Sequence, residues 1–71
     1  MFMDFEVKTS GRYTARVFDV DGKEIHTLIN GVLAKGKATV GMRTTPLSQG
    51  VYFLTVEYKG EIIARKKLIV N

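Results

Sequence analysis

The longest run of strand-favouring residues in the chain lies between Gly50 and Tyr58. Nearly all of its residues are β-branched, aromatic or aliphatic, the types that are enriched in strands. Both alternating sets of side chains are apolar at the start of the run, and one set becomes polar toward its end. This pattern is typical of a central strand that is covered on both faces for half its length. Turn-forming residues follow at 59–61, so we expect a hairpin to a second strand over 61–70.

Strict alternation of apolar and polar residues predicts two strands nearer the start of the chain, over 3–7 and 13–20. A period of two indicates a strand that has one face in water. The residues at 9–12 form the turn between these strands. An Asp-Gly pair within 19–23 readily adopts the positive φ angles of a tight turn, so the second strand is expected to enter a hairpin there.

The third predicted strand, over 23–30, is less regular. Strict alternation would put Ile25 and Leu28 on opposite faces, so we expect a β-bulge or a bend in this strand. An Asn-Gly pair at 30–31 predicts that the strand ends in a turn. The short apolar segment 32–34 is then expected to pack against the core.

Residues 37–42 predict a fourth strand, whose glycine favours an edge position, and residues 43–49 a connection with one extended stretch. No segment has a helical period, and glycines recur at roughly the 8–12-residue spacing of all-β folds. The chain is therefore expected to be all-β, an immunoglobulin-like antiparallel β-sandwich of six to seven strands. A small five-stranded barrel is the competing architecture.

Eight apolar side chains are expected to contribute to the core: Val17, Ile25, Leu28, Val40, Tyr52, Leu54, Val56 and Leu68. Gly50 precedes the central strand where the chain must turn, and a positive φ angle is expected there. A second apolar set faces away from the main stripe: Val51, Phe53, Ile63 and Ile69. Because so small a chain does not cover both faces, we expect the isolated domain to form a weak homodimer.

The chain has 71 residues, which predicts a single small domain spanning 1–71. It contains no cysteine, so neither a disulfide nor a thiolate metal site supports its core. The net charge of +4 permits anionic partners without requiring one. No apolar run approaches the roughly 20 residues of a membrane-spanning helix, so no membrane insertion is expected. The first residues carry acids where a secretory signal would be basic.

Residues with the chemistry of a catalytic or metal site are few. His26 is the only histidine, whereas a zinc site needs three or four ligands. Asp19 and Asp21 offer too few oxygens for a calcium loop, and we expect both to accept hydrogen bonds from turn amides. The hydroxyl side chains have no paired base, and no glycine-rich phosphate loop occurs. We therefore expect neither enzymatic activity nor a cofactor.

The basic run Arg65 to Lys67 raises an alternative function, an accessory module that binds single-stranded nucleic acid. The rings that could stack on bases are Tyr13, Phe18, Tyr52, Phe53 and Tyr58. Aromatic residues on strands more often belong to the core, and lysines at strand edges prevent edge-to-edge pairing, so nucleic-acid binding is the weaker interpretation. Carbohydrate binding is a further alternative, although the chain has no tryptophan, the commonest stacking platform.

Three segments, taken in order, resemble a known family. They are the turn at 17–23, the run Leu47 to Leu54 with its Gly-Val-Tyr-Phe-Leu sequence, and the Lys-Lys-Leu-Ile-Val sequence at 66–70. Over roughly residues 12–71 the chain resembles the C-terminal sorting domain of type IX secretion cargo. A sister family, the immunoglobulin-like domains of flagellar hook-capping proteins, resembles the chain less closely.

The resemblance implies a non-catalytic immunoglobulin-like sandwich that ends a larger secreted protein and follows its N-terminal cargo domain. Such a protein passes through the periplasm of a Gram-negative bacterium, and the outer-membrane secretion machinery recognises the domain. A sortase-like peptidase then removes it, and the cargo is released or attached to the cell surface.

On this interpretation the recognition residues lie in two of the matching segments: Gly50, Val51, Tyr52, Phe53, Lys66, Lys67, Leu68 and Val70. The final strand is expected to be recognised as a sheet edge or as a charged apolar tail. A structural β-sandwich spacer of a larger protein, with no receptor, is the alternative that the same residues would satisfy.

Overall fold

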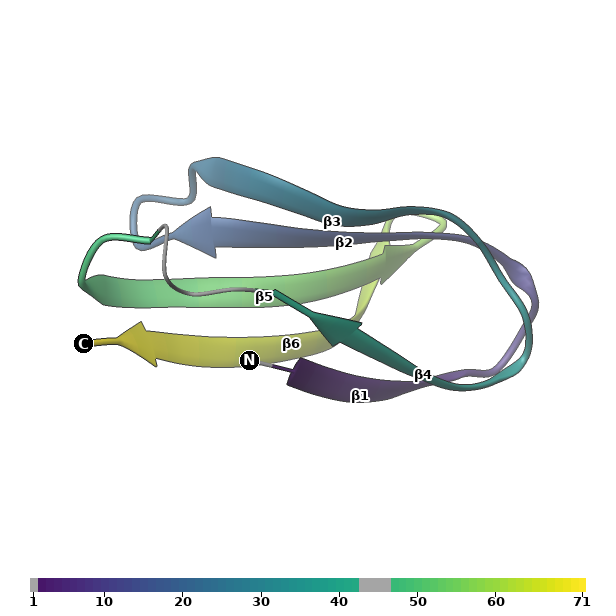
Figure 1. Ribbon diagram of the computed structural model, residues 1–71. Helices are drawn as coiled ribbons and strands as arrows, with labels where there is room; N and C mark the ends of the chain where they lie inside the picture. Colours follow the sequence, from purple (N-terminus) through teal and green to yellow (C-terminus); the bar gives the residue numbers. More distant parts are fainter. Residues whose placement is uncertain (1, 43–46) are drawn as a thin grey trace.

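The computed structural model describes residues 2–42 and 47–71, and these contain six strands and no helix (Figure 1). The strands are β1 (Phe2–Val7), β2 (Gly11–Asp19), β3 (Glu24–Leu33), β4 (Gly36–Gly41), β5 (Gly50–Tyr58) and β6 (Glu61–Val70). A smaller sheet pairs β1 with β4, and a larger sheet has the order β3-β2-β5-β6, with every neighbouring pair antiparallel. The two sheets pack as a sandwich, which confirms the expected fold and excludes the five-stranded barrel.

The core lies between the two sheets and follows the period of two in the sequence. Alternate residues of β1 and β2 are buried, as strict alternation predicted, whereas β5 buries Tyr52, Leu54 and Val56 on its inner face and Thr55 on the other. The buried apolar residues are Met3, Phe5, Val7, Tyr13, Ala15, Val17, Val40, Tyr52, Leu54, Val56 and Leu68. All eight expected core residues are confirmed, because Ile25 and Leu28 are partly buried against this cluster and the other six belong to it.

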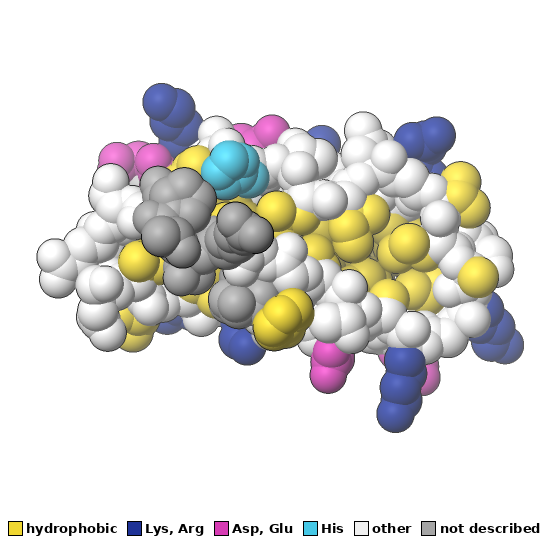
Figure 2. Space-filling model, in the orientation of Figure 1, with side chains coloured by type: hydrophobic (Ala, Val, Ile, Leu, Met, Phe, Trp, Pro, Cys, Tyr) yellow, Lys and Arg dark blue, Asp and Glu magenta, His cyan; other side chains and the backbone are white. Residues whose placement is uncertain are grey.

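The smaller sheet does not cover the whole inner face of the larger one. Two strands pack against four, and several apolar residues of the larger sheet, such as Ile29 and Ala64, are only partly buried against the core. Apolar side chains are therefore visible on the side of the molecule that carries β1 and β4 (Figure 2).

The irregularity of β3 has the expected cause. Ile25 and Leu28 are the two residues of β3 that have no partner in the β2 ladder, and a register shift occurs at each of them. Each therefore forms a β-bulge, which turns an extra apolar side chain toward the core. The bulged residue itself is left without a paired residue on β2. The break in alternation was the sequence signal for these bulges, and the expectation of a bulge is confirmed.

The prediction of a turn at 30–31 is wrong. β3 continues through both residues to Leu33, with Gly31 opposite Tyr13 and Val32 opposite Arg12. Pairing with β2 supplies the backbone hydrogen bonds of this segment, and this outweighs its local preference for a turn. The expected packing of 32–34 is correct only for Leu33, since Val32 is 73% exposed and the residue after Leu33 is also exposed.

The β2–β3 turn forms where the Asp-Gly pair predicted it. The Oδ1 atom of Asp19 accepts hydrogen bonds from the backbone amides of Asp21 and Lys23, at 2.9 and 3.0 Å. Gly22 has a φ of +83°. The role expected for Asp19 is therefore confirmed, whereas the carboxylate of Asp21 accepts no hydrogen bond from the described residues. The extended stretch expected within 43–49 involves residues 43–46, which lie outside the part described.

Gly50 begins β5 with a φ of +156°, which confirms the expected positive angle. An added Cβ would lie 4.0 Å from the Tyr52 ring, so the backbone angle and not the space available restricts this position to glycine. Gly50→Ala should lower the free energy of unfolding by about 1–3 kcal/mol in urea denaturation. Gly31→Ala is the matched control, because a Cβ at this strand glycine meets nothing within 4 Å. Equal stability of the two variants would contradict the assignment of strain to Gly50.

Two tyrosines near the starts of their strands tie the strands to the preceding connections. The Tyr13 hydroxyl donates to the carbonyl oxygen of Thr9, and the Tyr52 hydroxyl donates to that of Ser48, both at 2.6 Å. Each bond spans four residues, like the tyrosine corner of immunoglobulin-like sandwiches. Both rings are buried, so the hydroxyls satisfy backbone acceptors that water does not reach easily.

Tyr13→Phe and Tyr52→Phe should each lower the free energy of unfolding by about 1–2 kcal/mol, because each leaves a carbonyl without its donor. Tyr58→Phe is the control, since the Tyr58 ring stacks on Tyr13 at 4.6 Å but its hydroxyl donates to none of the described residues. Urea denaturation of the three variants makes the comparison. A loss as large for Tyr58→Phe would show that the hydroxyl bonds are not the cause.

Candidate recognition surface

The eight recognition residues expected from the sequence lie together at one end of the β5–β6 hairpin. The segment 50–54 pairs antiparallel with the segment 66–70, so the two matching segments become neighbours in the sheet. The hairpin turn at Lys59 and Gly60 has φ angles of +50° and +80°, as a type I′ turn requires. This turn sets the register that joins the two segments.

Strand alternation divides these residues between the two faces of the sheet. Tyr52 and Leu68 are paired on the inner face and are only 7% and 6% exposed, so they belong to the core. Val51, Phe53 and Lys67 lie on the outer face, where Phe53 is opposite Lys67. A partner can therefore contact the outer three residues while the sandwich stays folded, but it cannot reach Tyr52 or Leu68.

The two adjacent lysines point to opposite sides of β6. Lys66 is paired with Leu54, whose side chain is in the core, and its Nζ atom donates to the carbonyl oxygen of Phe2 at 3.1 Å. Lys66 thus connects β6 to β1, the neighbouring strand of the smaller sheet (Figure 1). Lys67 is exposed on the outer face. β6 is also the last strand of the larger sheet, so its outer edge is paired with no other strand of the described chain.

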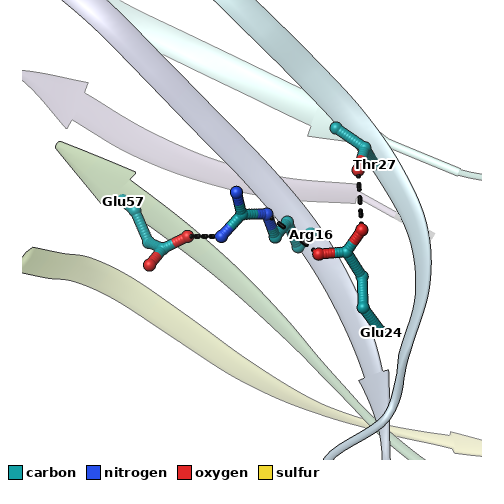
Figure 3. Close-up of polar contacts among 4 residues, drawn as sticks. All are labelled: Arg16, Glu24, Thr27 and Glu57. Carbon is teal, nitrogen blue, oxygen red and sulfur yellow. Dashed lines mark hydrogen bonds and ion pairs between the residues drawn. The ribbon is translucent and has the colours of Figure 1, made fainter. Parts of the chain in front are cut away.

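An ion-pair network crosses the outer face of the larger sheet. Arg16 on β2 contacts the Glu24 carboxylate through its Nε atom at 3.0 Å and the Glu57 carboxylate through its Nη1 atom (Figure 3). The Thr27 hydroxyl donates to the second oxygen of Glu24 at 3.1 Å. The three charged side chains are 25–45% exposed, so water screens the network and its contribution to stability is small. Its main effect is to neutralise Arg16.

Arg65 on β6 has a different environment. Its guanidinium carbon lies 4.7 Å from the centre of the Phe53 ring, and no carboxylate of the described residues pairs with it. In the sequence Arg65 stands out only as part of a basic run. Its distance of two residues from Lys67 on the same strand was the signal that both lie on the outer face.

Thr55 is the one buried polar side chain of the described chain whose oxygen has no hydrogen-bond partner. It lies in β5 between Arg16 on one side and Arg65 on the other. Because an unpaired buried hydroxyl is destabilising, Thr55→Val should raise the free energy of unfolding by about 1 kcal/mol.

Thr39→Val provides the control for this prediction, because the Thr39 hydroxyl donates to Asp4 at 2.7 Å on an exposed surface. The control variant should be neutral or slightly destabilised. If Thr55→Val were destabilised as well in thermal denaturation, the hydroxyl would have a partner in solution.

The four apolar residues expected to face away from the core all lie outside the core cluster. Ile69 is 67% exposed on the outer face, and Val51 and Phe53 are half-buried there. Ile63 is 42% exposed, and it lies at a bulge because it has no partner in the β5 ladder. It lines a cavity of about 310 Å³ between the sheets, together with Tyr13 and Tyr58.

The remaining candidates from the sequence do not assemble into a chemical site. His26 is exposed on β3. In residues 2–42 and 47–71, no three histidine, aspartate or glutamate side chains are close enough to hold a metal ion. Of the five candidate stacking rings, Tyr13 and Tyr52 are buried, one face of Phe53 is covered by Arg65, and Tyr58 stacks on Tyr13.

Comparison with protein families identifies one match, and it covers the fold just described. The family model of the secretion system C-terminal sorting domain matches residues 3–71, which includes β2 to β6 and all of β1 except Phe2, and begins earlier than the resemblance over 12–71. Comparison with curated proteins and with solved structures gives no significant match. None of the described residues forms a helix of the length and hydrophobicity that crossing a membrane requires. Since the family match spans both sheets and both segments that meet in the β5–β6 hairpin, the chain belongs to the type IX secretion C-terminal sorting domain family and is a sorting signal.

Proposed function

We propose that this sorting domain is the C-terminal module of a larger secreted protein, and that the 50–54 and 66–70 end of its β5–β6 hairpin is the surface that the secretion machinery recognises. The observation that supports the proposal is the pairing of these two segments in one ladder. They are the segments that carry the family resemblance, and their outer side chains and the free edge of β6 are accessible.

The proposed recognition residues have two different roles. Val51, Phe53 and Lys67 offer side chains to a partner on the outer face, and Lys66 offers its charge near the edge of β6. The remaining four act by holding the strands: Gly50, Tyr52, Leu68 and Val70. An edge strand with accessible side chains is a recognised mode of binding to another protein, because the backbone groups of the edge are free to pair.

We propose in addition the route that this family implies for the cargo. The cargo domain precedes the sorting domain, the precursor passes through the periplasm of a Gram-negative bacterium, and a sortase-like peptidase removes the domain after export. The domain itself has no catalytic activity on this proposal, in line with the sorting role of its family. A weak homodimer through the exposed apolar residues is part of the proposal, and sedimentation over a concentration series tests it.

The test of the sorting function is an export assay. Residues 1–71, fused behind a periplasm-directed reporter, should carry the reporter to the surface or the medium of a bacterium that has the type IX machinery. The fusion must include β1, because Met3, Phe5 and Val7 are core residues. The reporter without the domain should stay in the periplasm. Retention of the intact, folded fusion in the periplasm would contradict the proposed function of this chain.

A further inference from the structure

A hollow of about 280 Å³ opens on the outer face of the larger sheet, at the end near the β2–β3 turn. Its walls come from β2, that turn, β5 and β6. They consist of Phe18, Asp19, Val20, Gly22, Phe53, Thr55, Ile62 and Arg65. The strand residues among them alternate with core residues, as Phe53 and Thr55 do on either side of Leu54, so the hollow faces away from the smaller sheet.

The hollow contains a positive charge, that of Arg65, which forms no ion pair with the described residues. Asp19 is the only carboxylate in the lining, and its Oδ1 atom is engaged by the amides of the β2–β3 turn. Arg16, the other arginine beside Thr55, is paired with two glutamates, whereas Arg65 has only the Phe53 ring beneath it. A guanidinium stacked on a ring keeps its N–H groups free around its edge, where a carboxylate binds in the same plane.

The hollow also contains an unpaired hydrogen-bonding group. Thr55 is 5% exposed, and its hydroxyl oxygen has no partner in the free domain. Around it the lining is apolar, with Ile62 58% and Val20 65% exposed to solvent. Exposed apolar side chains around an unpaired polar group and an unpaired charge are the features of a ligand site, in which a few polar groups orient an apolar ligand.

We propose that this hollow binds a segment of a partner protein in which an aspartate or glutamate accompanies an apolar side chain. The carboxylate pairs with Arg65, the apolar side chain packs on Phe18, Phe53 and Ile62, and the Thr55 hydroxyl gains a hydrogen bond. Lys67, opposite Phe53 on the same face, adds to the attraction for an acidic segment. The volume suits one or two side chains, so the occupant is an extended segment and not a folded face.

This inference deepens the proposed function by giving the chemistry of the partner. It rests on the proposed function in one respect: the partner is taken to be part of the secretion machinery. The hollow adjoins the proposed recognition residues, since Phe53 belongs to both. Binding to the isolated domain is measured without export. A failure of the binding site is therefore distinguishable from a failure of the sorting function.

The experiment is a titration of the isotope-labelled chain, residues 1–71, followed by two-dimensional amide NMR. The probes are hydrocinnamate, which joins a ring to a carboxylate, and its neutral amide, which has the same shape. Hydrocinnamate should shift the amide signals of Phe53, Thr55 and Arg65. It should bind about tenfold more tightly than the amide, the ratio that one charge-assisted hydrogen bond gives.

Three variants assign the binding to the hollow. Arg65→Gln should abolish the preference for hydrocinnamate over its amide, and Thr55→Val should weaken the binding of both probes. Arg12→Gln is the matched control, because Arg12 lies on the same outer face with the same charge but donates to Asn30 and lies outside the hollow. This variant should bind each probe within about twofold of the affinity of the unsubstituted chain. The charge of Arg12 is far from the hollow and is screened by solvent.

The results that would overturn the proposal are distinct. Equal affinity for the two probes, or an undiminished preference in Arg65→Gln, would exclude a carboxylate site at Arg65. The absence of any shift at hollow residues would exclude the site altogether. The titrations use a protein concentration at which sedimentation shows only monomer, because the proposed weak homodimer would itself shift the signal of Phe53.

Discussion

Leu54→Ala is expected to lower the free energy of unfolding by about 2–5 kcal/mol. Leu54 has no exposed surface and lies in the middle of β5, between β2 and β6. Its removal leaves a cavity that rigid strands on both sides cannot close. A domain of this length has a total stability of roughly 4–10 kcal/mol, so the substitution consumes a large part of it. Urea denaturation followed by far-ultraviolet circular dichroism measures the loss.

Val32→Ala is the control for this prediction. Val32 is, like Leu54, an aliphatic residue within a strand, but its side chain is 73% exposed on the outer face. Its truncation should change the free energy of unfolding by no more than about 0.5 kcal/mol. If the two variants lost similar stability, the core would not be centred on β5, and the sandwich described for this chain would be wrong.

The centre of the core was predictable because its signal is local. In β1 and β2 each buried side chain is two residues from the next, as are the buried apolar side chains of β5, and this period can be read from a few neighbouring residues. The bulges at Ile25 and Leu28 had the same kind of signal, since each breaks the alternation where it occurs. Local patterns therefore predicted which faces are buried.

The extent of β3 was not predictable, because pairing with a distant strand decides it. The Asn-Gly pair at 30–31 favours a turn in a short peptide, but here both residues lie in the ladder with β2. The bulge at Ile63 likewise depends on a register shift opposite β5 that no pattern within β6 reveals. Such features depend on contacts between segments far apart in the chain, and alternation carries no information about them.

The candidate surface was predictable as a pair of segments but not as a set of accessible side chains. The sequence placed Tyr52, Leu68 and Lys67 in one recognition set, whereas the first two are buried and only the third is exposed. Strand period already separates Lys66 from Lys67, because adjacent residues point to opposite faces. The neutralisation of Arg16 and the unpaired state of Arg65 depend on cross-strand neighbours, so only the structure distinguishes these two arginines.

Removal of residues 66–71 is expected to abolish both folding and export. The segment supplies Leu68 to the core, and its backbone pairs with residues 50–54 of β5. Loss of that burial and of several ladder hydrogen bonds should cost about 4 kcal/mol or more, which approaches the whole stability of the domain. Circular dichroism of the truncated chain should show loss of the strand signal, and the fused reporter should stay in the periplasm.

Truncation alone does not separate recognition from folding, so substitutions of the two lysines are the sharper test. Lys66→Ala with Lys67→Ala removes two exposed charges and one hydrogen bond to Phe2, and should change stability by less than about 1 kcal/mol. We expect this variant to stay folded and to lose most of its export. Lys67→Ala should account for most of the loss, because Lys67 faces outward beside Phe53.

The matched control replaces two exposed lysines at the other end of the molecule, Lys35→Ala with Lys37→Ala. It changes the net charge by the same amount but leaves the hairpin untouched, so export should continue at the level of the unsubstituted domain. Equal loss of export in both variants would mean that the machinery responds to net charge. Full export of the folded Lys66 and Lys67 variant would show that recognition depends on other groups of the hairpin, and the lysines would then have no part in sorting.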